Sequence, residues 1–357
     1  MRVLILCPYP AGEAPSQRFR FEQYLERSSS ASFTFTISPF WSLRAWQRLY
    51  KEGNTWTKSM ALLTGLLRRT ADLFRAPAFD FVLIHREAAP IGPPVFEWIL
   101  AHVLRRKIIY DFDDAIWIPN TSAENRLAAS LKWHDKVASI CRWSYRISAG
   151  NAYLCRYAST YNSNVVLNPT TIDTELLHNR LLYPEQAHEL PVIGWTGTHS
   201  TLVYLEPLLP ALRELEKTHT FRFVVICNHA PAWHLNSLEF RRWSKDTEIP
   251  DLMQLDIGVM PLVQDMWAEG KCGFKALQYM ALGIPSVLSP VGVNKEIVEH
   301  GRNGFLCSTT EEWLTCLRML LDNAPLRQQL GKAGQETVRT RYSVRSNEAT
   351  FSGLFRK

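Results

Sequence analysis

The sequence lacks the cysteine patterns that support small secreted proteins or zinc sites. Its seven cysteines are scattered over 357 residues, without a Cys-x-x-Cys pair or a regular spacing. A disulfide framework is therefore not indicated, and thiols that are mostly buried and reduced are typical of a cytoplasmic protein. A P-loop, a nucleophile elbow and zinc-binding spacing are also missing, which removes several common classes of enzyme from consideration.

Long apolar runs and strong charge imbalance are missing as well. No stretch approaches the ~18 to 20 apolar residues of a membrane-spanning helix, so the sequence does not predict an integral membrane protein. The short apolar run after Arg2 leads into prolines, which favours a first buried strand over a signal peptide. The formal net charge of +6 is too small to indicate a nucleic-acid partner.

The length and the order of apolar segments predict two α/β domains. At 357 residues the chain exceeds one ordinary core. Strand-like and helix-like segments alternate, which is the pattern of parallel sheets covered by helices. The expected strands of the first half are Arg2–Cys7, Phe79–His85, Lys107–Asp113, Arg146–Gly150 and Asn164–Asn168. Those of the second half are Pro191–Gly197, Phe221–Cys227, Asp256–Leu262 and Ser286–Ser289.

We place the domain boundary between residues 180 and 181, so that 1–180 and 181–357 each form a doubly wound, Rossmann-like domain. The last helix could cross back to the first domain. Ligands of such sheets collect at the carboxyl ends of the strands. With two such domains, the inter-domain cleft is the expected site.

The most informative segment runs from Glu269 to Ser289. Gly283 and Pro285 form a strong helix-end signal before a buried strand. If the helix begins near Gly270, its free N–H groups face the strand-to-helix loop, where an anion would be stabilised. Spacings of four and three residues then place Lys271, Lys275 and Gln278 on one face. The segment predicts a helix whose polar face meets a negatively charged ligand.

These residues resemble the donor-site signature of retaining GT-B glycosyltransferases of the large group 1 family. The matching stretch is Gly270–Pro285. The family is also resembled at Ile193–Gly197, Pro290–Asn294, Gly301–Leu306 and Arg341–Ser343. The resemblance implies a GT-B fold in which the second domain holds a sugar nucleotide, UDP- or GDP-linked, and the first holds the acceptor. It implies no required cofactor.

The sequence departs from the family pattern at the paired glutamates. Family members commonly carry two glutamates eight positions apart, but here Gln278 stands at the second position and Gly270 at the first, beside Glu269. An amide can hydrogen-bond a ribose without the strength of a carboxylate, and Glu269 is the candidate for the sugar-side role. The usual Arg and Lys after the first strand of the second domain are also missing. The expected donor-binding residues are Gly197, Thr198, His199, Gly270, Lys271, Cys272, Gly273, Lys275 and Gln278, with the two lysines neutralising the diphosphate.

Three acids and neighbouring polar residues follow strands of the first half. Asp113 falls near the position where many relatives carry a histidine, so we expect it to orient the acceptor or stabilise charge at the sugar carbon. The alternatives are a helix cap or an ion pair with Arg86 or Arg126. Asp111 and Asp113 also permit a metal-dependent GT-A-type reaction. The remaining candidates are His85 as a catalytic residue and Gly12, Arg18 and Arg86 on the acceptor side, with Gln17 and Arg20 beside them.

Basic and aromatic residues gather between Trp41 and Arg75. The cations are Arg44, Arg48, Lys51, Lys58, Arg68, Arg69 and Arg75, opposed only by Glu52 and Asp72. Such a stretch suits the surface of an anionic membrane. The alternative is a pair of ordinary helices with one buried and one solvated face.

The sequence as a whole predicts a cytoplasmic hexosyltransferase, at the inner face of the cell membrane if the basic stretch binds lipid. It would transfer a sugar from a nucleotide donor to a glycan or lipid-linked hydroxyl acceptor in surface polysaccharide or glycolipid synthesis, with retention and without an obligate metal. A non-catalytic sugar-nucleotide-binding protein is the second alternative, suggested by Gln278 and the missing Arg and Lys.

Overall fold

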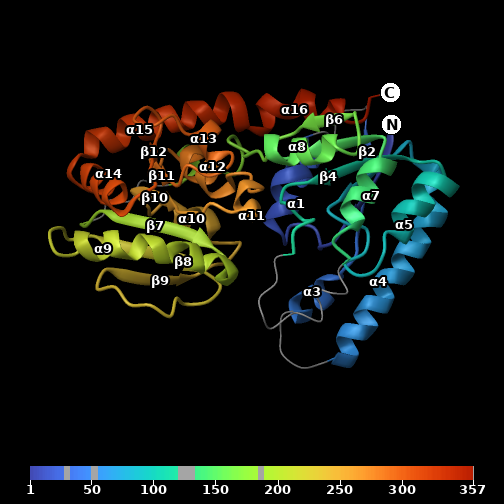
Figure 1. The fold of residues 1–357 in the computed structure, drawn as a ribbon, viewed down its shortest axis with the longest axis horizontal. Helices are drawn as coiled ribbons and strands as arrows, with labels where there is room; N and C mark the ends of the chain where they lie inside the picture. The colour runs from blue at the N-terminus through green and yellow to red at the C-terminus, as the bar shows by residue number, and fades with distance from the viewer. Residues whose placement is uncertain (28–32, 50–54, 120–132, 184–188, 357) are drawn as a thin grey trace. The chain divides into compact units, whose positions relative to one another are not determined.

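The computed structural model describes residues 1–27, 33–49, 55–119, 133–183 and 189–356. The chain divides into two compact units. Unit 1 contains Met1–Thr170 and Glu348–Lys357, and unit 2 contains Thr171–Asn347 (Figure 1). In the described part of the chain, each unit is built on a six-stranded sheet flanked by helices. The predicted α/β fold with two doubly wound sheets is therefore confirmed.

The sheet of unit 1 has the order β2-β1-β3-β4-β5-β6, and all its strands pair in parallel. The strands are β1 (Arg2–Cys7), β2 (Thr34–Pro39), β3 (Phe81–His85), β4 (Lys107–Phe112), β5 (Arg146–Ala149) and β6 (Val165–Leu167). Five of them were expected near these positions. Edge strand β2 was missed, because its mixture of threonine, serine and half-buried side chains lacks a long apolar run.

Helices connect successive strands of unit 1 and cover its sheet. They are α1 (Pro15–Gln17), the π-helical η1 (Arg18–Glu22), α2 (Gln23–Arg27), α3 (Leu43–Leu49), α4 (Thr55–Arg75), the 3₁₀ turn η2 (Ala76–Ala78), α5 (Val95–Trp98), the π-helical η3 (Ile99–Val103), α7 (Lys136–Trp143) and α8 (Ala152–Ser159). The basic stretch of the sequence therefore forms two helices, α3 and α4. Lys51 and Glu52 lie outside the described residues.

The end of the described chain belongs to unit 1. Helix α16 (Val344–Gly353) begins in unit 2, and Glu348–Lys357 then pack in unit 1. Phe351 stacks on Tyr24 with ring centroids 4.3 Å apart, and the Arg146 guanidinium donates to the Gly353 carbonyl at 2.5 Å. This return completes a cluster of aromatic rings beside the sheet of unit 1.

The sheet of unit 2 has the order β12-β11-β10-β7-β8-β9 and is also parallel. The strands are β7 (Val192–Gly197), β8 (Arg222–Cys227), β9 (Leu238–Arg242), β10 (Ile257–Met260), β11 (Ser286–Leu288) and β12 (Phe305–Leu306). The edge strands β9 and β12 were not expected from the sequence. Every residue of β10 and β11 is buried, as the apolar runs predict.

Two apolar layers cover the faces of this sheet. The helical segments of unit 2 are η5 (Arg180–Leu182), η6 (His199–Leu208), α9 (Leu209–Leu215), α10 (Glu248–Leu252), α11 (Met266–Glu269), α12 (Phe274–Ala281), α13 (Asn294–Ile297), α14 (Thr310–Asp322), α15 (Ala324–Thr337) and η7 (Val338–Tyr342). One layer includes α9 and α14, and the other includes α10 and α12. The central strands are therefore packed between two apolar layers, which fix the position of their carboxyl ends.

All seven cysteines are free thiols, and six of them are buried. Among the described helices, none combines the length and the apolar character needed to cross a membrane.

Candidate active site

His85 and Asp111 meet at the carboxyl ends of two adjacent strands of unit 1. The last residue of β3 pairs in register with Asp111 of β4, and His85 Nδ1 lies 2.8 Å from an Asp111 oxygen. Both side chains are buried. His85 Nε2 is also buried, and it has no hydrogen-bond partner in the described chain.

Asp111 is the centre of a buried polar network that the sequence did not predict. Arg20 from η1 forms an ion pair with it, with side chains 0% and 4% exposed. Ser148 of β5 donates its hydroxyl at 2.6 Å. Burial raises the pKa of Asp111, but Arg20 and His85 outweigh it and hold the pKa below its usual range. Arg20 also donates to the Asn168 carbonyl, so its guanidinium is committed to the interior.

Arg86 follows His85 in a strained conformation and binds two acids. Its φ of 60° lies in the left-handed region, which a residue with a side chain rarely adopts. Its guanidinium donates to Asp113 at 2.8 Å and to Asp114 at 2.6 Å. Burial lowers the pKa of Arg86, but the two carboxylates raise it well above its usual value. The ion pair that the sequence offered as an alternative is thus present, whereas Arg126 lies outside the described residues.

The loop after β1 is tied to the same end of the sheet. The Gly12 N–H donates to Glu22 at 2.8 Å, and the Gln17 amide donates to the same carboxylate at 3.1 Å. Burial raises the pKa of Glu22, while Arg18 and His85 act in the opposite direction. Arg18 is largely buried and lies over the Phe19 ring. The structure therefore brings all the predicted residues of unit 1 to the carboxyl ends of β1, β3 and β4.

In unit 2, Gly197 ends β7, Thr198 follows it, and His199 begins η6. Thr198 and His199 are exposed. The His199 N–H donates to the side-chain oxygen of Asn228, which follows β8, at 2.8 Å, and its ring lies edge-on to His229 with centroids 5.2 Å apart. Sequence reasoning missed Asn228 and His229, although both directly follow a strand of the same sheet.

The segment expected to be one helix from Gly270 onward is two helices with a turn between them. α11 ends at Glu269, and α12 begins at Phe274 after Gly273, whose φ is 67°. A Cβ at Gly273 would also lie 2.3 Å from Ile297. The predicted helix start was therefore wrong by four residues, because a left-handed glycine interrupts the helix. Gly270, Lys271 and Cys272 belong to the turn.

The two lysines consequently do not share a helix face. Lys271 lies in the turn with its ammonium 5.6 Å from the centre of the Trp267 ring. Lys275 lies in the first turn of α12, 5.5 Å from the centre of the Trp195 ring in β7. Both are half-buried. Lys275 is therefore held near the end of β7 by a cation–π contact.

Gln278 lies inside unit 2. It is 1% exposed, and its amide nitrogen is 3.1 Å from His178 Nε2. The two residues are 100 positions apart, so no local pattern could have revealed the contact. To reach a ribose, this amide would have to exchange His178 for a hydroxyl.

Glu269 approaches the loop after β11. A Cβ at Gly292, whose φ is 53°, would lie only 2.9 Å from the Glu269 carbonyl oxygen. The buried Asn294 donates to the Ser289 carbonyl at 3.0 Å and so fixes the same loop. The motif Pro290–Asn294 thereby positions the backbone of the predicted sugar-side residue.

The GT-A alternative offered by the sequence is wrong, because the fold is of another class. Two parallel six-stranded sheets do not match that class, and the carboxylates of Asp111 and Asp113 are engaged by Arg20 and Arg86. Among the described residues, no cluster of three or more His, Cys, Asp or Glu side chains could hold a metal ion.

The structure resembles solved glycosyltransferases along its whole length. Sucrose-phosphate synthase from Thermosynechococcus elongatus matches with a TM-score of 0.68 and 14% identity, over 99% of this chain and 98% of that one. HepE from Anabaena, solved with UDP, matches with a TM-score of 0.66 and 13% identity over 99% of both chains. A glycosyltransferase from Rickettsia africae gives a TM-score of 0.67 and 11% identity, over 99% and 97%. At these identities the likeness shows the fold, which is GT-B.

A match in sequence identifies the class. Residues 190–323 match the model of the family glycosyl transferases group 1, whereas no curated protein has a significant match. The matched segment runs from β7 to the end of α14 and contains every donor-binding candidate. The chain is therefore a glycosyltransferase of GT-B fold, and residues 190–323 of its second unit match the group 1 family model.

Proposed function

We propose that this protein transfers a hexosyl group from a nucleotide sugar to a hydroxyl acceptor, with retention of configuration and without an obligate metal. The observation that carries the proposal is the overlap between the matched segment, residues 190–323, and the residues around Lys275. Structural neighbours support the donor class, because HepE was solved with UDP-glucose (TM-score 0.66, 15% identity). UDP-linked sugars are therefore tested first and GDP-linked sugars second.

The donor site that we propose lies at the carboxyl ends of β7, β10 and β11. Lys271 and Lys275 would neutralise the diphosphate, together with the N–H group of Gly273 in the turn. Gly270 would line the site without its N–H, which donates to the Trp267 carbonyl at 3.1 Å. Thr198 and His199 are exposed at the end of the neighbouring strand. Charge that develops on the leaving diphosphate would then meet fixed cations.

The remaining donor candidates are Glu269, Gly197, Cys272 and Gln278, and each has a separate proposed role. Glu269 would contact the transferred sugar, because its backbone is fixed against Gly292. Gly197 and Cys272 would line the site, and Gln278 would contact the ribose only after leaving His178.

The acceptor site that we propose lies on unit 1, at the ends of β1, β3 and β4. Asp113 would orient the acceptor hydroxyl, while Arg86 holds its carboxylate in place. Gly12 and Arg18 would line this side. His85 would act on the site through Asp111, because its ring is fully buried. The acceptor class is a glycan or a lipid-linked sugar of surface polysaccharide or glycolipid synthesis.

We also propose a cytoplasmic location with peripheral contact at the inner face of the cell membrane. The free thiols and the basic helices α3 and α4 support this part of the proposal.

Calorimetry with the full chain tests the donor assignment. A thermal-shift screen of UDP-, GDP-, ADP- and CMP-linked sugars selects the donor first. Lys275→Ala is then expected to weaken its binding about 10- to 100-fold, the loss expected for a charge-assisted hydrogen bond of about 1.5–3 kcal/mol. Lys332→Ala, an exposed lysine of α15, is the matched control. If Lys275→Ala binds the donor as the wild type does, the site assignment is wrong. If no nucleotide sugar binds or is turned over, the proposed function fails.

A further inference from the structure

Helix α4 carries large apolar side chains on the face that points away from unit 1. The exposed fractions are 76% for Trp56, 43% for Met60, 49% for Leu63, 62% for Leu67 and 83% for Phe74. Their spacings of four, three, four and seven residues place all five on one side of the helix. At 1.5 Å per residue the stripe is about 27 Å long.

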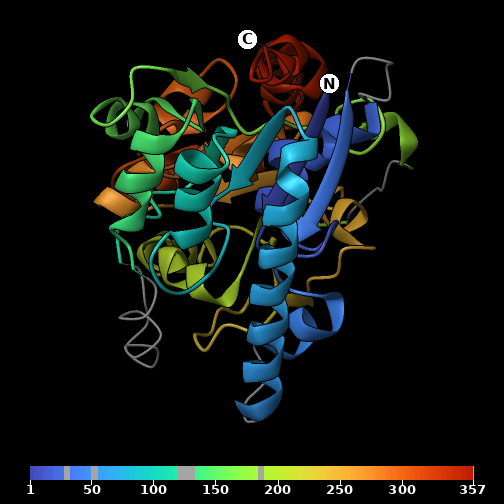
Figure 2. The same ribbon diagram turned by 90° about the vertical axis from the view of Figure 1, so that its right-hand side faces the viewer.

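The packing of α4 does not require this stripe. Its opposite face contributes Ala61, Leu62 and Leu66 to a separate cluster around Phe40 and Trp41. Single exposed apolar residues are ordinary on protein surfaces. An aligned row of five along one helix instead indicates a surface that binds a membrane or another protein. Figure 2 shows α4 in front of the other elements of unit 1 along its whole length.

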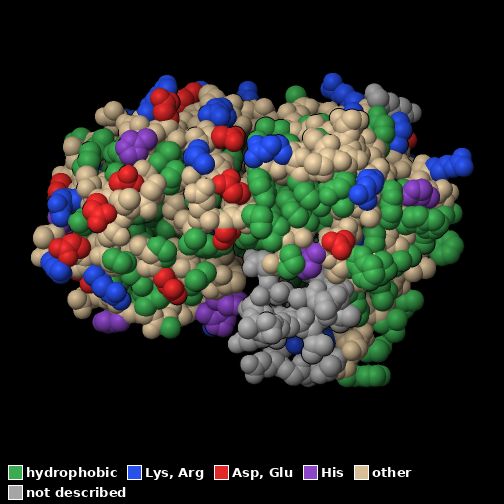
Figure 3. Space-filling view, viewed as in Figure 1, with side chains coloured by type: hydrophobic (Ala, Val, Ile, Leu, Met, Phe, Trp, Pro, Cys, Tyr) green, Lys and Arg blue, Asp and Glu red, His purple; other side chains and the backbone are tan. Residues whose placement is uncertain are grey.

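The neighbouring helices extend the apolar surface. The segment α5–η3 packs beside α4 and exposes 46% of Trp98 and 59% of Val103. Figure 3 shows hydrophobic side chains gathered on the right-hand flank, over α4 and α5.

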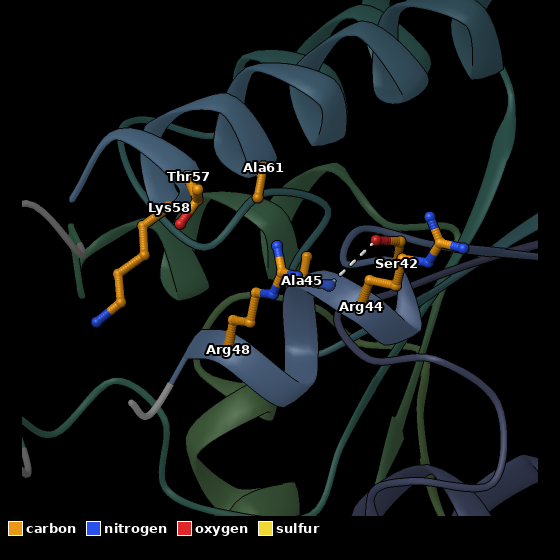
Figure 4. A pocket seen from close by; sticks show the side chains of 7 residues that line it. All are labelled: Ser42, Arg44, Ala45, Arg48, Thr57, Lys58 and Ala61. Carbon is orange, nitrogen blue, oxygen red and sulfur yellow. Dashed lines mark hydrogen bonds between the residues drawn. The ribbon is translucent and has the colours of Figure 1, made fainter. Parts of the chain in front are cut away.

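The charges that face solvent on α3 and at the start of α4 are positive. Arg44 and Arg48 are exposed on α3. Together with Lys58 they line a hollow of about 170 Å³ between α3 and α4. Figure 4 shows the Arg48 side chain directed into the space between the two helices, beneath Ala61, and Arg44 and Lys58 extending to opposite sides.

Acidic residues on the same elements are withdrawn from the surface. Asp72 of α4 is 2% exposed and paired with Arg69, and Glu97 of α5 is also 2% exposed. Over the described parts of α3, α4 and α5–η3, the charged groups that face solvent are therefore cationic. An apolar stripe on α4, with cations on the side of the helix that meets α3 and no solvent-facing acid among the described residues of these elements, complements a surface that is apolar inside and negatively charged outside.

We infer that the outer face of α4, with α3 beside it, docks on an anionic lipid surface. Trp56, Met60, Leu63, Leu67 and Phe74 enter the boundary between headgroups and acyl chains, and Arg44, Arg48 and Lys58 contact lipid phosphates. This inference rests on one part of the proposed function, the peripheral contact with the membrane. It does not depend on the proposed donor site. A protein partner would need a complementary acidic groove, whereas every anionic lipid supplies both properties.

Co-sedimentation of the full chain with vesicles tests this inference. Vesicles of phosphatidylcholine with one third phosphatidylglycerol are compared with pure phosphatidylcholine at low and high salt. The wild type is expected to bind the anionic vesicles, and less so at high salt. The variant Arg44→Gln/Arg48→Gln/Lys58→Gln is expected to lose on the order of 100-fold in affinity. Leu63→Ser/Leu67→Ser/Phe74→Ser is expected to lose binding at both salt concentrations.

Controls separate a lost surface from a lost fold. Leu176→Ser/Leu181→Ser/Met319→Ser removes exposed apolar residues of unit 2 and is expected to bind vesicles as the wild type does. A blue shift of tryptophan emission on binding is expected to shrink in Trp56→Phe, because the Trp56 ring enters the lipid.

Nucleotide-sugar binding on the same samples separates this inference from the proposed function, since the α3–α4 variants are expected to retain it. The inference is overturned if the wild type ignores anionic vesicles, or if both α3–α4 variants still bind them. It is also overturned if α4 variants abolish a dimer of this chain instead, which would assign the stripe to a second copy.

Discussion

Asp111 offers the sharpest test of how unit 1 holds its predicted site. Asp111→Asn removes the negative charge but preserves the size of the side chain. Arg20 then remains charged in the interior, where its side chain is 0% exposed. Removing one partner of a buried ion pair typically costs about 3–5 kcal/mol. A domain is stable by about 5–15 kcal/mol in total, so the variant should leave unit 1 close to unfolding.

Urea denaturation of the full chain measures this loss, and hydrogen exchange in β4 and β5 assigns it to unit 1. The control Glu175→Gln breaks an exposed pair with Arg345 and is expected to leave the midpoint nearly unchanged. The double variant Arg20→Met/Asp111→Asn should be less destabilised than the sum of its single variants, because no charge stays buried alone. Strictly additive effects, or a small loss in Asp111→Asn, would refute the reasoning.

The pH dependence has a definite sign. The folded pKa of Asp111 is depressed, so its contribution is fully present above the unfolded pKa of about 3.9 and is lost as the pH falls through the folded value. The difference between wild type and Asp111→Asn should therefore stay constant from pH 7 to pH 5 and shrink only in stronger acid.

Three further outcomes are expected. Gly292→Ala forces a side chain into a left-handed conformation against the Glu269 carbonyl, so donor affinity measured by calorimetry should fall although circular dichroism stays native; unchanged affinity would separate this loop from the donor site. Gln278→Leu leaves His178 without the Gln278 amide in the interior and should lower the stability of unit 2 by about 1–3 kcal/mol in urea, which an unchanged midpoint would contradict. Sugar transfer should survive EDTA if the proposed mechanism is right, and a loss restored by Mg²⁺ or Mn²⁺ would contradict it.

The sequence predicts the inner strands of both sheets well, because parallel strands that are covered on both faces need continuous apolar runs. Residues 108–110 of β4 and Ile257–Met260 are such runs. The edge strands escape this logic. Leu238–Arg242 carries alternating charged residues on a half-exposed edge, and Phe305–Leu306 is too short to show a period.

The site was predictable in outline, since residues after parallel strands must gather at one edge of a sheet. Its internal contacts were not predictable. Arg20 reaches Asp111 across 91 positions and His178 reaches Gln278 across 100, and neither contact leaves a local pattern. The helix start near Gly270 failed for a related reason. A glycine permits a left-handed turn, but only the packing against Ile297 shows that Gly273 uses it.

The return of Glu348–Lys357 to unit 1 has a consequence for how the protein is made. A ribosome releases Met1–Thr170 long before Phe351 and Phe355 exist, and at ~5–20 residues per second the delay is on the order of ten seconds or more. During that interval the rings of Tyr24 and Phe81 lack the aromatic neighbours that cover them in the finished chain. Unit 1 therefore begins to fold first and is completed last. A fragment that ends at Thr170 would permanently expose the apolar surface around Tyr24 and Phe81, and it would be prone to aggregate.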